Sequence, residues 1–459
     1  MCSHKNIVKY YDSFQIEDNF YIVMEKVECS LKQWIDDNRK NQIEKVQFLR
    51  FALQMVEVAD YLHQKKHILS NISLKNIFLD KDLNIKFSTF TVKQEVSVYK
   101  LLNKQIYALE NNELIYFPLC LIDEGGNENL IIQSSKQDMY AIGLCLYCLT
   151  GVSYMDVLNY IQGGKFQINI NLGIDINQLL QLMLLRNSYS FVPTCCYFIQ
   201  SLQNIIKKGN ATLQIDKDEE IQLLKLFQEV VNKIDYIKEK QDELLGVKEK
   251  SEEIENDYSS ISLEKLRQLI QKYQNCDIYY FFEGCFHYRN QNDELSLHSL
   301  KIALELNEKN DIALYQQGLI FNELGLTQES LECYYQFCRL NPLDDEVYSN
   351  IGEIFLNEQD YKRSKKYFEA SLAINPRQYV AYLNIGQVYF QQKMFEKAAY
   401  YFKKTNKIKS DADAFYLLGY YYEQKKDYEK SLNSYKKSQL SNQSDLPYIN
   451  LINNIKSLI

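Results

Sequence analysis

Residues 345–376 read DEVYSNIGEIFLNEQDYKRSKKYFEASLAINP, and the pattern of this stretch returns along the C-terminal part of the chain. Its glycine belongs to a series at spacings of 34, 34, 34 and 33 residues: Gly284, Gly318, Gly352, Gly386 and Gly419. An aromatic residue or leucine stands four residues before each glycine, and a small residue stands twelve after it. Sixteen after it comes a large apolar residue: Leu300, Tyr334, Phe368, Phe402 or Tyr435. Self-similarity at a fixed period indicates a repeated structural unit.

The residue types of the repeat predict a pair of antiparallel helices. A glycine and a small residue facing each other let two helices approach closely, and the large residues fill the space around them. One such hairpin leaves an apolar face uncovered, so neighbouring units must stack. The segment resembles the tetratricopeptide repeat over five units, residues 277–445, and residues 446–459 are expected to form a capping helix.

That resemblance implies a groove that holds a protein or an extended peptide. In the family, the second, fifth, sixth and ninth places of each first helix face the groove, which here gives Phe281, Tyr315, Leu319, Leu383, Tyr416 and Tyr420, with the amides Gln316, Asn350 and Asn384. An amide both donates and accepts, so three amides at one repeat spacing can bond a peptide backbone. The alternative is that these amides are merely solvated. The lysine and asparagine set by which some members hold a chaperone's C-terminal carboxylate is not present at the matching places.

The N-terminal part carries a second set of motifs. HKNIVKYYDSF (4–14) and NFYIVMEKVECSLKQWI (19–35) are followed by YLHQKKHILSNISLKNIFLD (61–80) and DMYAIGLCLYCLTG (138–151). These motifs resemble the protein-kinase fold from its fourth strand onward, with Asp138 at the place of the usual aspartate of a central buried helix. Residues 1–205 are therefore expected to form a partial kinase-like domain, comprising the large lobe and the hinge strands.

The same resemblance implies that the chemistry of phosphoryl transfer is degenerate. Asn76 keeps the family's metal-ligand asparagine, and the five-residue spacing before it places Asn71 where the catalytic aspartate belongs. Ser73 replaces the loop lysine, and Thr89 replaces the aspartate of the metal-binding triplet. Asparagine cannot accept a proton at neutral pH, and a hydroxyl is a poor magnesium ligand. We therefore expect a pseudokinase with no cofactor, in which Asn76 is a vestigial cofactor-binding residue.

One alternative from another class stays open. The matched motifs begin after the family's glycine-rich loop, lysine strand and glutamate helix, so an active serine/threonine kinase would need a small lobe that this chain lacks. Under that alternative the chain binds ATP and magnesium, and its repeats recruit the substrate. The leading prediction is a non-catalytic scaffold or adaptor, in which the repeats bind proteins or peptides and the degenerate lobe is a second docking module.

Residues 206–276 are expected to be a helical, partly coiled-coil-like linker. Apolar residues follow a spacing of three and four, typical of a short coiled-coil seam: Leu223, Phe227, Val230, Ile234, Ile237 and Leu244. Because about three heptads give only marginal stability, packing against the lobe or the repeats is one use of this seam. Dimerisation through residues 223–245 is the other.

Composition excludes several classes of function. The net charge of −8 offers no sequence-independent attraction to nucleic acid or anionic lipid. No signal peptide and no apolar run long enough to span a membrane is present, and the eleven cysteines are scattered among apolar neighbours. We therefore expect a cytoplasmic protein with reduced cysteines, no metal site and no nucleic-acid or membrane partner. Its fold class is mainly α, a partial kinase-like fold followed by an α-α superhelix of five tetratricopeptide-type hairpins.

Overall fold

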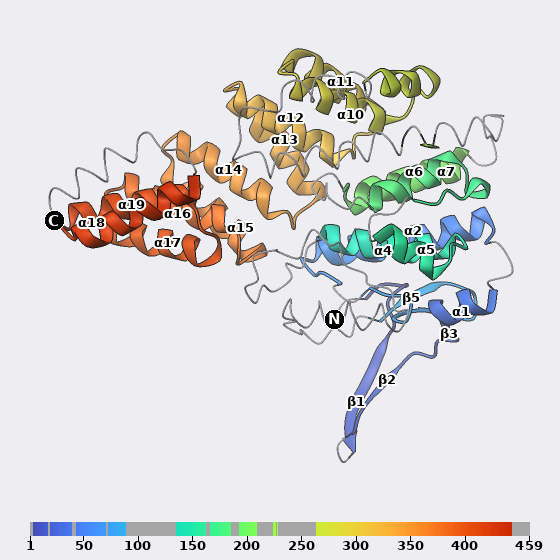
Figure 1. Ribbon diagram of the computed structural model, residues 1–459. Helices are drawn as coiled ribbons and strands as arrows, with labels where there is room; N and C mark the ends of the chain where they lie inside the picture. The colour runs from blue at the N-terminus through green and yellow to red at the C-terminus, as the bar shows by residue number, and fades with distance from the viewer. Residues whose placement is uncertain are drawn as a thin grey trace. The chain divides into compact units, whose positions relative to one another are not determined.

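The computed structural model describes residues 3–16, 19–38, 43–69, 72–88, 135–161, 166–184, 192–208, 224, 225, 227 and 263–442 (Figure 1). Described residues are mainly helical, as the sequence predicted, and the strands lie in the N-terminal part. The chain divides into two compact units. The first comprises residues 1–242, 251–320 and 339–343, and the second comprises residues 243–250, 321–338 and 344–459.

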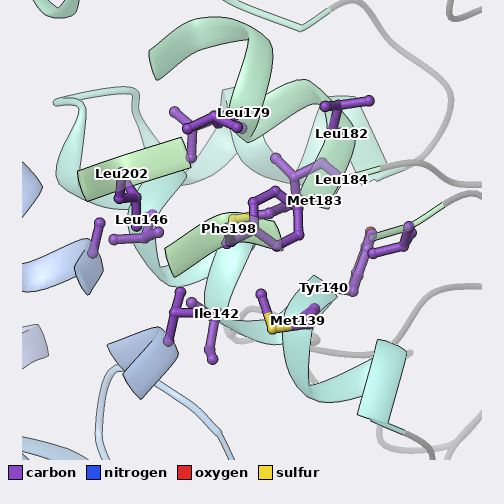
Figure 2. Packing of buried hydrophobic residues seen from close by; sticks show 14 of the residues in the cluster. Met139, Tyr140, Ile142, Leu146, Leu179, Leu182, Met183, Leu184, Phe198 and Leu202 are labelled. Carbon is purple, nitrogen blue, oxygen red and sulfur yellow. The ribbon is translucent and has the colours of Figure 1, made fainter. Parts of the chain in front are cut away.

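Helices of the kinase-like part contribute much of the core of the first compact unit. In chain order they are α1 (Leu31–Asn38), α2 (Lys45–Gln64), α4 (Ser135–Leu149), α5 (Tyr154–Ile161), the 3₁₀ turn η2 (Ile170–Leu172), α6 (Ile174–Met183) and α7 (Cys195–Lys208). Every residue of α4 except Lys136 is buried, which confirms the prediction of a central buried helix. Figure 2 shows its apolar side chains packed among those of α6 and α7. A Cβ atom on Gly143 would lie 2.7 Å from the Cβ atom of Met183, so this close approach requires glycine.

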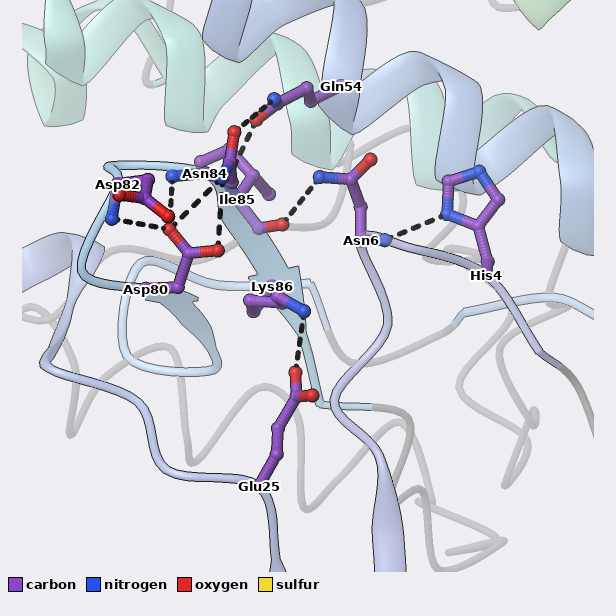
Figure 3. A network of polar contacts seen from close by, with 9 residues as sticks. All are labelled: His4, Asn6, Glu25, Gln54, Asp80, Asp82, Asn84, Ile85 and Lys86. Carbon is purple, nitrogen blue, oxygen red and sulfur yellow. Dashed lines mark hydrogen bonds and ion pairs between the residues drawn. The ribbon is translucent and has the colours of Figure 1, made fainter.

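Two small antiparallel sheets accompany these helices. One is the ribbon of β1 (Tyr10–Ile16) and β2 (Asn19–Met24); the other has the order β3-β4-β5, formed by β3 (Cys29–Ser30), β4 (Ile77–Leu79) and β5 (Ile85–Phe87). The turn between β4 and β5 is fixed by Asp80, whose carboxylate accepts hydrogen bonds from the backbone N–H of Asn84 at 2.8 Å and of Asp82 at 2.9 Å (Figure 3). Asn6 donates from its side chain to the carbonyl of Ile85 at 2.8 Å, which ties the N-terminal segment to this sheet.

Ten helices follow one another between residues 277 and 442, two in each of the five predicted units. They are α10 (Asp277–Arg289), α11 (Asp293–Leu306), α12 (Asp311–Glu323), α13 (Thr327–Leu340), α14 (Asp345–Asn357), α15 (Tyr361–Ile374), α16 (Tyr379–Gln391), α17 (Phe395–Ile408), α18 (Ala412–Gln424) and α19 (Tyr428–Asn442). The turn inside each unit holds one residue in the left-handed region: Gln291, Gly325, Gln359, Lys393 or Lys426.

The predicted contacts are present inside the hairpins of the first, third, fourth and fifth repeat units. A Cβ atom on Gly352 would lie 2.7 Å from the ring of Phe368, and one on Gly386 would lie 2.5 Å from the ring of Phe402. The small residue twelve places on has a further use that the sequence did not reveal. In the fifth unit the hydroxyl of Ser431 donates to the carbonyl of Gly419 at 2.9 Å, which fastens one helix to the other.

Helix caps divide the last three units into two kinds. Both helices of the third unit begin with an aspartate that accepts from a backbone N–H three residues on, Asp344 for α14 and Asp360 for α15. In the fifth unit Asp411 and Asp427 bond the backbone in the same way. The helices of the fourth unit begin at Gln378 and Met394 without such a side-chain bond.

Some predictions fall outside the described residues. These are the capping helix 446–459 and five members of the coiled-coil seam: Leu223, Val230, Ile234, Ile237 and Leu244. The sixth member, Phe227, is fully buried, and its ring centroid lies 5.8 Å from that of Tyr279 and 6.2 Å from that of Phe282. In the described part of the chain, no helix is long and apolar enough to cross a membrane.

Candidate functional site

The segment that the sequence analysis identifies as the catalytic loop leads into β4. Ser73 and Asn76 are half-buried there, and the carbonyl of Ser73 accepts hydrogen bonds from the N–H groups of Asn76 at 3.0 Å and Ile77 at 3.2 Å. The carbonyl of Asn76 accepts from the N–H of Ser88 at 3.2 Å. Asn71 and Thr89 lie outside the described residues. Ser73 therefore contributes its backbone carbonyl to a tight turn before β4.

The carboxylate of Asp138 holds the backbone at Leu69, just before this loop. Its Oδ2 atom accepts from the N–H of Leu69 at 2.8 Å and lies 2.8 Å from Nε2 of His63, with both side chains buried. Nδ1 of His63 in turn lies 3.4 Å from Sγ of Cys195. Burial raises the pKa of the Cys195 thiol well above its ordinary value, so this sulfur is a neutral group and not a nucleophile. The cluster holds the loop in place.

No group of three or more histidine, cysteine, aspartate and glutamate side chains within the described ranges could hold a metal ion. The cysteines of the Cys145 and Cys148 pair are both buried in α4, and burial raises the pKa of the Cys148 thiol to about 12. Neutral, enclosed thiols of this kind are structural.

The groove places of the first unit are covered. Phe281 is fully buried, and so are its neighbours on the same face of α10: Ile278, Phe282 and Cys285. They belong to one apolar cluster with Phe227 of the linker, and with Leu266 and Leu269 of the helical segment before α10. In this structure Phe281 is therefore not accessible to a peptide, because it lies inside that apolar cluster.

In the second unit the predicted groove residues are partly enclosed. Tyr315 and Leu319 are half-buried. Gln316 is 6% exposed, and its Nε2 atom has no hydrogen-bond partner among the described residues. The alternative that the groove amides are merely solvated therefore does not apply to Gln316. A buried amide group without a partner costs on the order of 1–3 kcal/mol, so its position needs a reason beyond packing.

The last three units keep accessible groove places. Tyr416 is 38% exposed and Tyr420 is 36% exposed, whereas Leu383 and Asn384 are each 8% exposed. Asn350 is half-buried, and its side chain lies near that of Tyr334. The two asparagines lie one repeat apart on α14 and α16, both at the sixth place.

A further set of polar residues was missed at the sequence level. The first helix of three units begins with an aspartate at spacings of 34 residues: Asp277, Asp311 and Asp345. Asp277 accepts from the side-chain amides of Asn307 at 3.1 Å and Asn310 at 2.9 Å. Burial is the main influence on each carboxyl group and raises its pKa to about 6, against the lowering effect of hydrogen bonds. The period itself was the signal that could have revealed them.

Asp345 repeats the arrangement of Asp277. Its Oδ2 atom accepts from the amides of Asn375 and Gln378, each at 2.9 Å. Asp311 differs, because its Oδ1 atom accepts from the backbone N–H of Thr194, at the start of α7, at 3.1 Å. At Asp277 and Asp345 this repeat position joins one hairpin to the next. At Asp311, within the first compact unit, it instead joins the kinase-like helices to α12.

Comparison with known proteins agrees with a kinase-like N-terminal part and a C-terminal part made of repeats. The protein kinase domain model matches residues 1–202, and a tetratricopeptide repeat model matches residues 345–378, 379–411 and 412–445. Serine/threonine-protein kinase Nek1 of Mus musculus is 25% identical over 47% of this chain and 17% of its own length. Serine/threonine-protein kinase PrkC of Bacillus subtilis is 30% identical over 32% of this chain and 22% of its own length. The chain thus spans about a fifth of the length of these kinases.

Among solved structures, a tetratricopeptide repeat protein of Thermus thermophilus is 18% identical and covers 40% of this chain and all of its own, with a TM-score of 0.34. Because that score is low, the assignment of the repeats rests on the sequence family and on the hairpins themselves. This chain contains a protein kinase domain over residues 1–202, followed by tetratricopeptide repeats over residues 345–445.

Proposed function

We propose that the protein is a non-catalytic scaffold, which binds proteins or extended peptides through its repeats and uses the kinase domain as a second docking module. The observation that carries the proposal is the residue at the place of the catalytic base, which is Asn71 and not an aspartate. With Thr89 at the place of the magnesium-binding aspartate, neither the proton transfer nor the metal has its usual carboxylate. The proposal includes no nucleotide cofactor.

The buried core of the kinase domain also supports the proposal of a docking module. The Leu69 contact of Asp138 and the buried α4 keep the domain's fold while the chemistry at the loop differs. A domain that keeps its packing and loses its reactive groups can still present a surface to a partner. The contact between Thr194 and Asp311 adds that this domain is joined directly to the repeat region.

Repeats of this kind present their stacked helices to proteins or peptides. We assign the partner surface to the last three repeat units, because the corresponding places of the first repeat unit are buried. With a net charge of −8, the proposed partner is a protein in the cytoplasm and not nucleic acid or a membrane. Dimerisation through residues 223–245 is left out of the proposal, because Phe227 packs on Tyr279 and Phe282.

The second candidate is a serine/threonine kinase. It is favoured by the match to the kinase domain and by the names of the relatives, which are serine/threonine kinases. Under this candidate the kinase domain binds ATP and magnesium, and the repeats recruit the substrate.

Nucleotide binding separates the two candidates. Ligand that binds only the folded state raises stability by mass action, so a thermal-unfolding titration with ATP and magnesium measures it directly. We expect no shift of the unfolding midpoint at millimolar ATP for the scaffold. The Asn71→Asp, Thr89→Asp double variant is the matched comparison, because it restores both carboxylates. A midpoint that rises in the unchanged protein, together with transfer of labelled phosphate to a generic substrate, would establish the kinase instead.

A further inference from the structure

The groove places of the last three units carry charge of one sign. The second, fifth, sixth and ninth places of α14, α16 and α18 lie on one face of each helix. Three of these twelve places hold exposed carboxylates, Glu346, Glu353 and Asp413, and none holds a lysine or arginine. The three helices contain no cationic residue at any place. We call these twelve places the first-helix face.

The second helices of the same units carry mostly positive charge. Together α15, α17 and α19 hold eleven lysine or arginine residues and three glutamates. Their cations are largely engaged within the protein. Arg363 and Lys430 each lie 2.6 Å from the aspartate that caps their helix, and Lys365 and Lys397 lie over the ring of Tyr389 at 5.3 and 5.4 Å from its centroid.

The carboxylates of the first-helix face have no such compensation. Among the described residues, no ion pair involves Glu346, Glu353 or Asp413. Asp413 instead lies near Asp411, and burial followed by this like charge raises the pKa of its carboxyl group. A cation brought to this face would meet exposed negative charge that nothing in the described part of the protein neutralises.

A second observation on the same face indicates a peptide backbone. Asn384 at the sixth place of α16 is 92% buried, since 8% of it is exposed, and no hydrogen bond of its side chain is found in the described part of the structure. The amide atoms themselves are not among the fully enclosed unpaired polar atoms of the described residues, so they stay open to a ligand that offers hydrogen bonds. Next to it lies Leu383, and one unit further on the rings of Tyr416 and Tyr420 are about two-fifths exposed. Apolar contact and backbone bonding are thus available beside the carboxylates.

We propose that the first-helix face binds an extended peptide in which lysine or arginine side chains alternate with apolar ones. The carboxylates of Glu346, Glu353 and Asp413 pair with the cationic side chains, Asn384 bonds the peptide backbone, and Leu383 and the tyrosines contact the apolar side chains. This inference rests on the proposed function of the repeats and adds the chemical class of the ligand. Opposite charges across the interface give selectivity and fast association.

The test uses the full chain and three short fluorescein-labelled peptides. All three alternate leucine and tyrosine with one polar residue, which is lysine in the first peptide, glutamine in the second and glutamate in the third. Fluorescence anisotropy measures the dissociation constants at low and high salt. We expect the lysine peptide to bind at least about tenfold more tightly than the glutamate peptide at low salt, with the difference shrinking as salt screens the charges.

Variants then locate the site. Glu346→Gln, Glu353→Gln and Asp413→Asn combined should weaken the lysine peptide about tenfold and leave the glutamine peptide unchanged, since each exposed pair contributes only a few-fold. The matched control is Glu369→Gln, Glu396→Gln and Glu429→Gln, which removes the same charge from the second helices and should change nothing. Asn384→Ala should weaken all three peptides alike, because it acts on the backbone.

The outcomes test separately the preference for cations, the assignment to the first-helix face and the peptide-binding role of the repeats. Tight binding of the glutamine or glutamate peptide, equal to that of the lysine peptide, would overturn the preference for cations and leave the scaffold intact. An equal loss in the control variant would also overturn the assignment to this face. Absence of binding for all three peptides would contradict both this inference and the peptide-binding role of the repeats.

Discussion

The first repeat unit and the last three have the same helical-hairpin fold. They differ in whether the groove places of the first helix are buried or exposed. In α10 the four groove places are buried in an apolar cluster that also contains Phe227, Leu266 and Leu269. In α18 the equivalent places carry Asp413, Tyr416 and Tyr420, all of them exposed. The repeat pattern therefore specifies how two helices pack against each other. It does not specify whether the outer side of the first helix becomes core or surface.

The largest expected effect tests that difference at one repeat position. Phe281 and Tyr416 both stand at the fifth place, yet Phe281 is fully buried and Tyr416 is 38% exposed. Phe281→Ala should lower the free energy of unfolding by about 3–5 kcal/mol, because it leaves a cavity in the core. Tyr416→Ala should lower it by about 1 kcal/mol. Urea denaturation followed by circular dichroism measures both, and equal losses would mean that the two faces do not differ.

An intermediate effect concerns a feature that both regions share. Asp277 and Asp345 open the first helix of their units, and burial raises the pKa of each carboxyl group from 3.8 to about 6. Between about pH 4 and pH 6 the folded chain keeps a proton that the unfolded chain has released. Stability from each group is therefore fully present below about pH 4 and is lost as the pH rises through 6, by up to about 3 kcal/mol.

The variant Asp345→Asn isolates this contribution. It removes the titrating group, so the difference in unfolding midpoint between pH 4.5 and pH 7 should be smaller in the variant than in the unchanged protein. Asp277→Asn should behave in the same way if the two units share the arrangement. A pH dependence that survives in both variants would show that other groups, such as Asp344 and Glu346 beside Asp345, determine it.

The smallest effect tests the interior of the hairpin. Ser296 donates to the carbonyl of Gly284 at 2.8 Å in the first unit, and Ser431 donates to that of Gly419 at 2.9 Å in the fifth. Replacing either serine by alanine should cost about 1 kcal/mol of unfolding free energy, since the buried carbonyl loses its bond. The two losses should agree, and Ala398→Ser in the fourth unit is the reverse comparison. Unequal losses would show that the hairpins differ inside as well as outside.

Much of the fold could be read from the sequence because it depends on periodic contacts. The spacing of sixteen residues between Gly386 and Phe402 reports a contact inside one unit, and the structure contains it. The burial of Phe281 could not be read in this way. Phe281 belongs to one apolar cluster with Phe227, Leu266 and Leu269, which are outside the repeat and follow no period of it. A pattern that is local in sequence predicts local packing, whereas the covering of a face depends on segments that the pattern does not include.

The candidate site was predictable to a similar degree. Residue identities at Asn71 and Ser73 were available from the kinase motifs, and the groove places followed from the repeat register. The near-complete burial of Asn384 was not available, because an asparagine in a helix is usually solvated. The aspartate series was visible as a 34-residue period but carries meaning only once its burial and its amide partners are known.

The missing caps of the fourth unit give the array a weak point. In a linear stack each unit is held by its own helices and by its two neighbours, so the cost of local opening varies along the stack. A side-chain cap contributes about 1 kcal/mol, and α16 and α17 lack two that the adjacent units have. Amide hydrogens of these two helices should exchange with solvent first. Among the last three repeat units, the fourth should therefore open most readily, and Leu383 and Asn384 lie in it.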